Sequence, residues 1–199
     1  IIVFGDSLSD VGASPSAVLS AFKLLGGCAP AFPCPPYFEG RISNGPVAIE
    51  TFHGLAQAQL NPGIVLQGFA IGGAMTNDDN FAVLGGPGMF QQLHGTSALH
   101  GFNGYLTLTG GLADANALYV VWGGANDFFR AIQTNTLGLP TVGNAVGNLT
   151  GYVSSLAAAG ARQFLVPNLP DLSLTPAADA VAALLGPVDE RVERLTLRR

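Results

Sequence analysis

Short apolar runs recur along the chain and are separated by longer segments with helical spacing. The runs lie at residues 1–4, 66–71, 117–122 and 163–166, and each is followed by glycine or proline. Runs of this length, closed by turn-forming residues, are typical of buried strands. We therefore expect four strands, each of which ends at a sharp turn.

Segments with apolar residues at helical spacing fill the intervals between these runs. We expect helices over residues 15–25, 46–60, 125–133, 142–159 and 175–185, a further helix from 188 onward, and weak helical character over 91–110. Ser43 and Asn44 are candidate N-caps for the second helix, with Pro46 in its first turn. Strands that alternate with helices predict an α/β fold, in which a parallel sheet carries helices on both faces.

The composition fits one globular domain over residues 1–199. Hydrophobic residues make up 48% of the chain and charged residues 11%, and no linker or internal repeat divides it. The formal net charge is −5, and four of the eight Lys and Arg residues crowd the last nine positions. Residues 1–190 are therefore acidic, which argues against a nucleic-acid partner. No stretch approaches the 18 uninterrupted apolar residues of a transmembrane helix.

The only two cysteines, Cys28 and Cys34, lie in a Pro-rich loop. A local disulfide between them would indicate an oxidising compartment, and two buried free thiols are the alternative. Two cysteines without a cluster of histidines cannot form a metal site, and adjacent residues such as Asp78, Asp79 and Asn80 rarely converge on one ion. We therefore expect no metal and no cofactor, with residues 78–80 in a solvated loop.

Three glycine-containing loops follow the first three strands. The carboxyl ends of parallel strands meet at one edge of a sheet, where open α/β proteins bind ligands. The first loop places Ser7 at this edge, the second Gly73 and the third Asn126. Acyl transfer needs a nucleophile and hydrogen-bond donors directed at the developing oxyanion. Ser7 offers a hydroxyl and an N–H, Gly73 an N–H unobstructed by a Cβ, and Asn126 an uncharged amide.

Other polar residues in these loops have structural interpretations. Asp6 and Asp10 are expected to accept hydrogen bonds from backbone N–H groups around the first turn. Asp127 is expected to cap the helix that begins beside it. Arg41 either pairs locally or lines the entrance to the site, and the sequence leaves both alternatives open.

These segments resemble the sequence blocks of the GDSL lipase/esterase family, also called SGNH hydrolases. Residues 5–10 (GDSLSD) resemble its first block, residues 69–74 (FAIGGA) its second and residues 124–127 (GAND) its third, and residues 37–47 are similar to a stretch found in lipase-like members. The resemblance implies a flavodoxin-like, three-layer α/β/α fold with a parallel sheet. It also implies an ester substrate, Ser7 as the nucleophile, and an oxyanion hole formed by Ser7, Gly73 and Asn126.

The chain departs from the family in its last block, Asp-x-x-His, which supplies the general base. No such motif occurs in the 199 residues, and Asp189 has Val192 where the histidine should stand. The strand expected before this block is missing as well. We therefore expect a secreted protein that is truncated after Arg199 and has lost an N-terminal leader. His53, His94 and His100 are less favoured substitutes for the base.

Three functions are consistent with these observations. The favoured one is a serine esterase or lipase that acts through an acyl-enzyme on a small-molecule or lipid ester. The second is a phospholipase or lipid acyltransferase with the same site, in which Phe81, Leu84, Met89 and Phe90 form a rim for transient contact with a lipid surface. The third is a catalytically inactive fragment or binding module that lacks the base.

Overall fold

A computed structural model of the chain describes residues 1–12, 38–81, 87–97, 102–176 and 178–179. Contacts divide the chain into one compact unit, Ile1–Asn168, and a second that begins at Leu169. The single domain predicted over residues 1–199 stays a prediction. The helix expected over 15–25, both cysteines and His100 lie outside the described residues.

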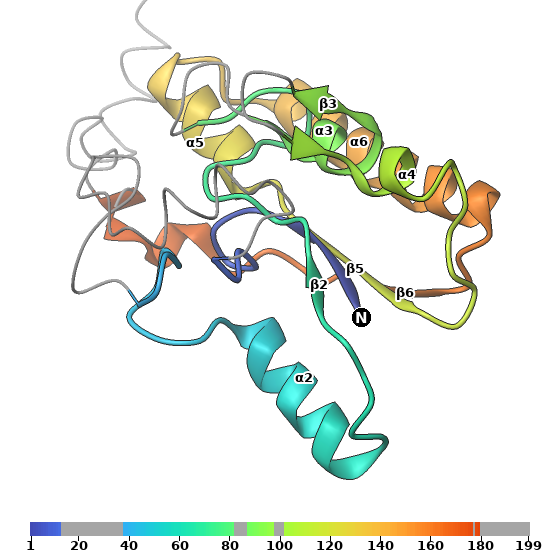
Figure 1. Ribbon diagram of the computed structural model, residues 1–199. Coiled ribbons are helices and arrows are strands. Elements are labelled where there is room, and N and C mark those ends of the chain that lie inside the picture. The colour runs from blue at the N-terminus through green and yellow to red at the C-terminus, as the bar shows by residue number, and fades with distance from the viewer. Residues whose placement is uncertain (13–37, 82–86, 98–101, 177, 180–199) are drawn as a thin grey trace, which may run out of the picture. The chain divides into compact units, whose positions relative to one another are not determined.

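The first unit is built on a four-stranded parallel sheet, which confirms the α/β fold class (Figure 1). Its strands are β1 (Ile2–Gly5), β2 (Gln67–Gly68), β5 (Leu118–Trp122) and β6 (Gln163–Leu165), in the spatial order β2-β1-β5-β6. Each strand overlaps one of the apolar runs in the sequence, although β2 takes up only two residues of the run 66–71. In the register, Ile2 pairs with Gln67 on one side and with Tyr119 on the other. The three loops after β1, β2 and β5 therefore leave the sheet at the same edge.

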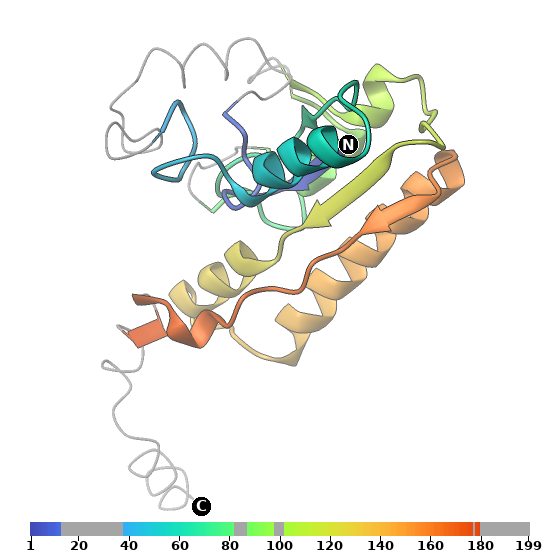
Figure 2. The same cartoon turned by 90° about the horizontal axis from the view of Figure 1, so that it is seen from below.

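Side chains of the inner strand β1 alternate between two hydrophobic clusters, one on each face of the sheet. Ile2 and Phe4 belong to the larger cluster and Val3 to the smaller one. The helices are α2 (Ala48–Gln59), α3 (Met89–His94), α4 (Tyr105–Leu108), α5 (Ala125–Gln133) and α6 (Leu139–Ala159). α2 and α6 lie on opposite sides of the sheet, whose strands run side by side in both views (Figures 1 and 2). Both faces are thus covered, as the alternation of strands and helices predicted.

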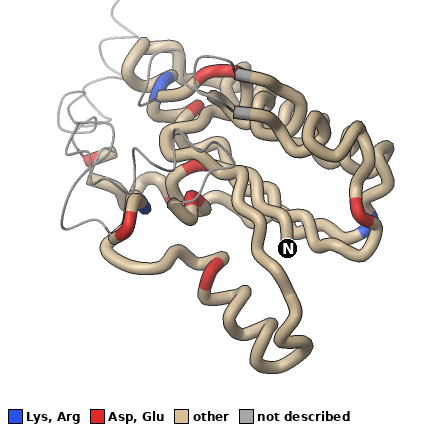
Figure 3. The backbone as a smooth tube through the Cα atoms, viewed as in Figure 1, with Lys and Arg blue, Asp and Glu red and all other residues tan. Residues whose placement is uncertain are grey.

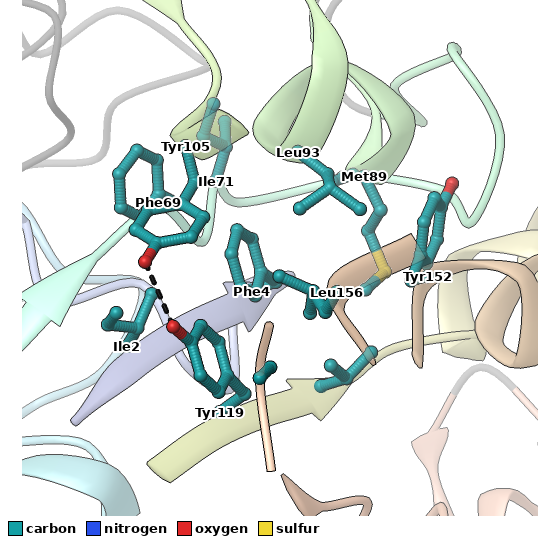
Figure 4. Packing of buried hydrophobic residues seen from close by; sticks show 13 residues of the cluster. Ile2, Phe4, Phe69, Ile71, Met89, Leu93, Tyr105, Tyr119, Tyr152 and Leu156 are labelled. Atoms are coloured by element: carbon teal, nitrogen blue, oxygen red, sulfur yellow. Dashed lines mark hydrogen bonds between the residues drawn. The ribbon is translucent and has the colours of Figure 1, made fainter. Parts of the chain in front are cut away.

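Aromatic rings fill the larger cluster (Figure 4). Phe4 stacks on Phe69 with ring centroids 5.4 Å apart, and the ring of Tyr105 meets both edge-on. The hydroxyl groups of Tyr105 and Tyr119 lie 2.9 Å apart, and Tyr119 donates to the Asp114 carbonyl at 3.0 Å. Because these buried hydroxyls are paired, the rings bury their apolar surface without an unsatisfied polar atom.

The segment 91–110 is not one weak helix. Its described part contains α3, α4 and a short antiparallel pair between them, β3 (Thr96–Ser97) and β4 (Phe102–Asn103). The N–H of Gly104 donates to the carbonyl of Gly95 at 2.7 Å, which closes this pair at one end. Strand pairing is set by partners distant along the chain, so periodicity alone does not reveal it.

Two helix starts also differ from expectation. α2 begins at Ala48, and the side chain of Glu50 accepts from the N–H of Val47 at 2.9 Å, so neither Ser43 nor Asn44 caps this helix. The carboxylate replaces a cap from the preceding loop because it lies one turn inside the helix, close to the free N–H groups. α6 begins at Leu139, with Pro140 in its first turn.

The second unit is described only at its beginning. A short 3-10 helix, Leu172–Leu174, follows Asp171, whose side chain accepts from the Ser173 N–H at 3.0 Å. The Thr175 hydroxyl then accepts from the Ala178 N–H at 3.3 Å, as at a helix start. The remainder of the helices expected from residue 175 onward lies outside the described residues.

The four strands carry no charged residue, and charges fall on the loops and on the helices (Figure 3). A charge on a strand buried on both faces would lose its hydration without a partner, so the sheet excludes it. Across the described ranges, no helix combines the length and the apolar character needed to span a bilayer.

Candidate active site

The first loop turns sharply where β1 ends. A Cβ on Gly5 would lie 2.3 Å from the carbonyl oxygen of Trp122, so only glycine fits between the two strands here. The Ser9 N–H donates to the Asp6 carbonyl at 3.1 Å, and the Leu8 N–H to Asp6 Oδ1 at 3.0 Å. Ser7 is half-buried at the middle of this turn, and its hydroxyl and N–H form no hydrogen bond with any described residue.

Asp10 joins the first loop to the second. Its Oδ1 accepts from the Gly12 N–H at 2.9 Å, and its Oδ2 accepts from the Gly72 N–H at 2.8 Å. Asp10 as a whole is 1% exposed. The local hydrogen bonds expected of Asp6 and Asp10 are confirmed, and Asp10 makes an additional one across 62 positions of the chain.

Gly73 lies between two anchored neighbours. Gly72 is held by Asp10, and the carbonyl of Ala74 accepts from Asn126 Nδ2 at 2.9 Å. Gly73 has a φ of +79°, a conformation that favours glycine. Its carbonyl accepts from Phe81 N at 2.7 Å, whereas its N–H has no partner within the described ranges. The Gly73 N–H is therefore available as a donor, and hydrogen bonds hold Gly72 and Ala74 on either side of it.

Asn126 and Asp127 lie in the first turn of α5 and are both buried. Asp127 does not cap that helix, contrary to expectation. Its Oδ2 accepts from the Thr76 N–H at 2.9 Å and its Oδ1 from the Thr76 hydroxyl at 2.7 Å. The helix N-cap is Gly124, without a side-chain cap. The carboxylate instead satisfies two donors of a buried loop, for which no other acceptor is found among the described residues.

Side chains thus tie the three loops into one assembly. Asp10 links the first to the second, and Asn126 and Asp127 link the second to the third. From the other side, Asn148 in α6 donates to the Thr76 hydroxyl at 3.0 Å. The residues expected to act on a substrate therefore lie on loops that hold one another in place.

Burial raises the pKa of Asp6 to about 6. The hydrogen bond from Leu8 opposes this shift, whereas the charges of Asp127 and Asp10 add to it. Asp6 Oδ2 is buried and has no hydrogen-bond partner among the described residues. Burial also raises the pKa of Asp127, against the two hydrogen bonds from Thr76. The site therefore holds two carboxyl groups whose ionised form is disfavoured by burial, and Asn126 adds a hydrogen-bond donor to it without adding a charge.

We expect Asp6→Asn to stabilise the protein above pH 6 relative to pH 4. The pKa of Asp6 in the folded state exceeds its ordinary value of 3.8. The contribution of this carboxyl to the free energy of unfolding is therefore full below pH 3.8 and is lost as the pH rises to about 6. The amide stays neutral and keeps an acceptor for Leu8. Urea unfolding at pH 4 and pH 7.5 should show a relative gain of about 1–3 kcal/mol for the variant. Asp79→Asn, in an exposed loop, controls for the lost charge, and an equal change in both variants contradicts the prediction.

Of the two alternatives for Arg41, the structure supports local pairing. Its Nε and Nη2 donate to the two carboxylate oxygens of Glu50 at 2.9 and 2.7 Å, and its Nη1 donates to the Glu39 carbonyl. The bidentate pair anchors the segment that precedes α2. Ile42 in this segment packs on the second loop, since a Cβ on Gly72 would lie 2.3 Å from Ile42 Cδ1.

Neither described histidine bonds to Ser7. His53 Nε2 lies 2.8 Å from the carbonyl of Ile64, and His94 lies beside Phe90, with ring centroids 5.0 Å apart. Burial lowers the pKa of His94, which faces a cavity of about 580 Å³ next to Asp78. Among the described residues, no three His, Cys, Asp or Glu side chains gather as metal ligands would.

The rim expected for lipid contact is not one surface. Phe90 is 44% exposed, but Met89 is 1% exposed and belongs to the larger hydrophobic cluster. Phe81 is half-buried beneath the guanidinium of Arg130, and Leu84 lies outside the described residues.

Sequence reasoning missed two polar residues of this region, Thr76 and Gln92. Both are fully buried. Gln92 is a polar residue at a core position of a helix, beside the buried Leu93. That contrast in the pattern is a signal that could have marked it.

Comparisons with known proteins agree with the loop motifs. Residues 1–197 match the family model described as GDSL-like Lipase/Acylhydrolase. The chain is 35% identical to esterase EstA of Pseudomonas aeruginosa, over 89% of this chain and 29% of the relative. It is 29% identical to phosphatidylcholine-sterol acyltransferase of Aeromonas hydrophila, over 89% of this chain and 46% of the relative. It is 24% identical to lipase 1 of Photorhabdus luminescens, over 88% of this chain and 23% of the relative. The chain therefore spans less than half the length of each of these relatives.

Proposed function

Because the chain belongs to the GDSL-like lipase/acylhydrolase family, as its sequence motifs predicted, we propose that it hydrolyses carboxylic esters through an acyl-enzyme on Ser7. The observation that carries this proposal is the link between three loops. The half-buried Ser7 lies on a turn tied through Asp10 to the loop of Gly73, and that loop is tied through Asn126 to α5.

In the proposed reaction, Ser7 Oγ attacks the acyl carbon and its proton passes to an imidazole base. The family resemblance implies an Asp-x-x-His block for that base, which these 199 residues do not contain. The carbonyl oxygen becomes an oxyanion that accepts from the N–H groups of Ser7 and Gly73 and from Asn126 Nδ2. Collapse of this intermediate expels the alcohol, which takes the proton, and water then releases the acid.

Asn126 has enough N–H donors to hold the second loop and to bind the proposed oxyanion. A side-chain amide carries two N–H hydrogens, and the bond to Ala74 uses one of them. The second is left for the oxyanion, on a nitrogen whose position the first bond restricts. Donors that are already oriented need little reorganisation when charge develops, which is why they lower the barrier.

A second candidate is transfer of the acyl group to an alcohol other than water. It is favoured by the similarity to a relative named phosphatidylcholine-sterol acyltransferase, and it uses the same acyl-enzyme. Secretion and contact with a lipid surface stay predictions. The 38% exposed Leu8 next to Ser7 is apolar surface that a lipid ester could contact.

A fluorophosphonate probe tests the nucleophile directly. It phosphonylates a serine that an imidazole base activates, so the sample is the full-length protein, and we expect one adduct per molecule. Trypsin cleaves after Lys23, the first basic residue of the 199, and fragmentation of the peptide that ends there should assign the adduct to Ser7 rather than Ser9. Ser7→Ala should abolish labelling and ester hydrolysis together. Hydrolysis that persists without labelling at Ser7 overturns the proposal, and product analysis with added alcohols separates hydrolysis from transfer.

A further inference from the structure

A buried glutamine side chain pairs with the backbone at the end of β1. Gln92, in α3, is 0% exposed and lies 87 positions from Gly5 in the sequence. Its Oε1 accepts from the Gly5 N–H at 2.8 Å, and its Nε2 donates to the Gly5 carbonyl at 2.7 Å. One planar amide thus engages both polar groups of a single residue, as a neighbouring peptide would.

This side chain takes the place of a strand residue. Between β1 and the chain of β2, Phe69 N donates to the Val3 carbonyl at 2.8 Å and Ile71 N to the Gly5 carbonyl at 3.1 Å. A regular parallel ladder would continue with the Gly5 N–H donating to the Phe69 carbonyl. Gln92 Oε1 accepts that hydrogen instead, so the regular pairing stops one residue before the turn that carries Asp6 and Ser7.

α3 is itself fixed against the other two loops. The N–H of Met89 donates to the carbonyl of Met75 at 2.9 Å, close to Gly73. Met89 Sδ packs on Gly123, where a Cβ would lie 2.3 Å from the sulfur. Gly123 directly precedes the third loop. One short helix therefore contacts the base of each loop, and Gln92 makes its contact with the first.

We propose that Gln92 is a positioning residue for the nucleophile, an inference that rests on the proposed function of Ser7. Gly5 is two residues before Ser7, and its polar groups are buried, so they need partners. By pairing both groups, the amide of Gln92 fixes the direction in which the chain leaves β1. This direction sets where the Ser7 hydroxyl lies relative to Gly73 and Asn126.

Gln92→Leu should lower kcat for ester hydrolysis by about 10- to 100-fold and change KM by less than about 3-fold. A leucine keeps the volume but removes both hydrogen bonds, and a nucleophile displaced by about 1 Å can lose about 10²-fold in rate. The matched control is Gln91→Leu on the same helix, since Gln91 Oε1 is buried and has no hydrogen-bond partner in the described ranges. We expect the control to retain kcat within about 3-fold.

Gln92→Glu separates positioning from a general structural role. A protonated carboxyl accepts and donates as the amide does, whereas an ionised carboxylate has no donor for the Gly5 carbonyl. The ratio of variant to natural kcat should therefore approach one at acid pH and fall as the introduced carboxyl ionises. The titratable groups Asp6, Asp10, Asp127 and His94 are present in both proteins, so the ratio at each pH isolates the introduced carboxyl group. A ratio that does not change with pH overturns the inference.

Amide hydrogen exchange provides a readout independent of chemistry. Gln92→Leu should speed exchange over residues 5–10 while the exchange of β5 and α6 stays as in the natural protein. A lower melting temperature with unchanged kcat and unchanged exchange over residues 5–10 overturns the inference. If the natural protein neither labels at Ser7 nor hydrolyses esters, the proposed function fails, and the exchange experiment alone then decides whether Gln92 fixes the turn.

Discussion

Ser7→Ala should lower kcat for ester hydrolysis by about 10³-fold or more and leave the free energy of unfolding within about 0.5 kcal/mol of the natural value. The loss is expected because the proposed acyl-enzyme forms on the hydroxyl that this substitution removes. The stability is expected to hold because the Ser7 hydroxyl is half-buried and bonds to no described residue. Steady-state kinetics with p-nitrophenyl esters and urea unfolding of the full chain measure the two effects.

Ser9→Ala is the matched control in the same turn. The Ser9 hydroxyl is buried and has no hydrogen-bond partner among the described residues, so its removal costs no interaction that the structure shows. We expect kcat within about 3-fold of the natural value and an equal or higher stability, since an unpaired buried hydroxyl is unfavourable. If Ser9→Ala lost as much activity as Ser7→Ala, the turn as a whole and not the Ser7 hydroxyl would be responsible.

Asn126→Ala should lower kcat by about 10²- to 10³-fold with a smaller change in KM, the loss typical of one oxyanion donor. The substitution also removes the hydrogen bond to the Ala74 carbonyl, for which we expect a loss of about 1 kcal/mol in the free energy of unfolding. Kinetics with a short-chain ester and urea unfolding separate the two contributions.

The control for loop anchoring is Asn148→Ala. Asn148 also donates a side-chain amide to the second loop, at the Thr76 hydroxyl, but it does so from α6. Its loss should cost about 1 kcal/mol of stability and less than about 5-fold in kcat. Equal losses of kcat in the two variants would mean that Asn126 only anchors the loop, and the oxyanion role would have to be abandoned.

Ser7→Ala and Asn126→Ala test different parts of the proposed site. In the proposed mechanism, Ser7 supplies the atom that bonds to the substrate, whereas Asn126 and Gly73 supply donors that are already oriented when the chain has folded. In this arrangement Asp10 and Asp127 act through the backbone, because their carboxylates accept from Gly72 and Thr76 on either side of Gly73. The donors of the proposed oxyanion hole are oriented when the chain folds. The reaction itself therefore needs little further free energy to orient them.

Local patterns were sufficient for the strands of the parallel sheet and for the loops that carry the site, but not for the pair of β3 and β4. The four apolar runs became β1, β2, β5 and β6, and the helix predicted over 125–133 became α5 with the same bounds. Such elements follow from neighbours within a few positions, through propensity and hydrophobic period. The convergence of the loops follows as well, because parallel strands have their carboxyl ends at one edge.

The sequence alone therefore determined the fold class, the family, and the loops on which Ser7, Gly73 and Asn126 lie. Only the tertiary structure decided the partners of the buried polar groups. Gln92 bonds to Gly5, and Asp127 bonds to Thr76 instead of capping its own helix. A buried donor takes whichever acceptor packing brings within about 3 Å, and that acceptor can be 50 to 90 positions away in the chain. No local pattern encodes such a pairing, because burial creates the demand and the arrangement of distant elements meets it.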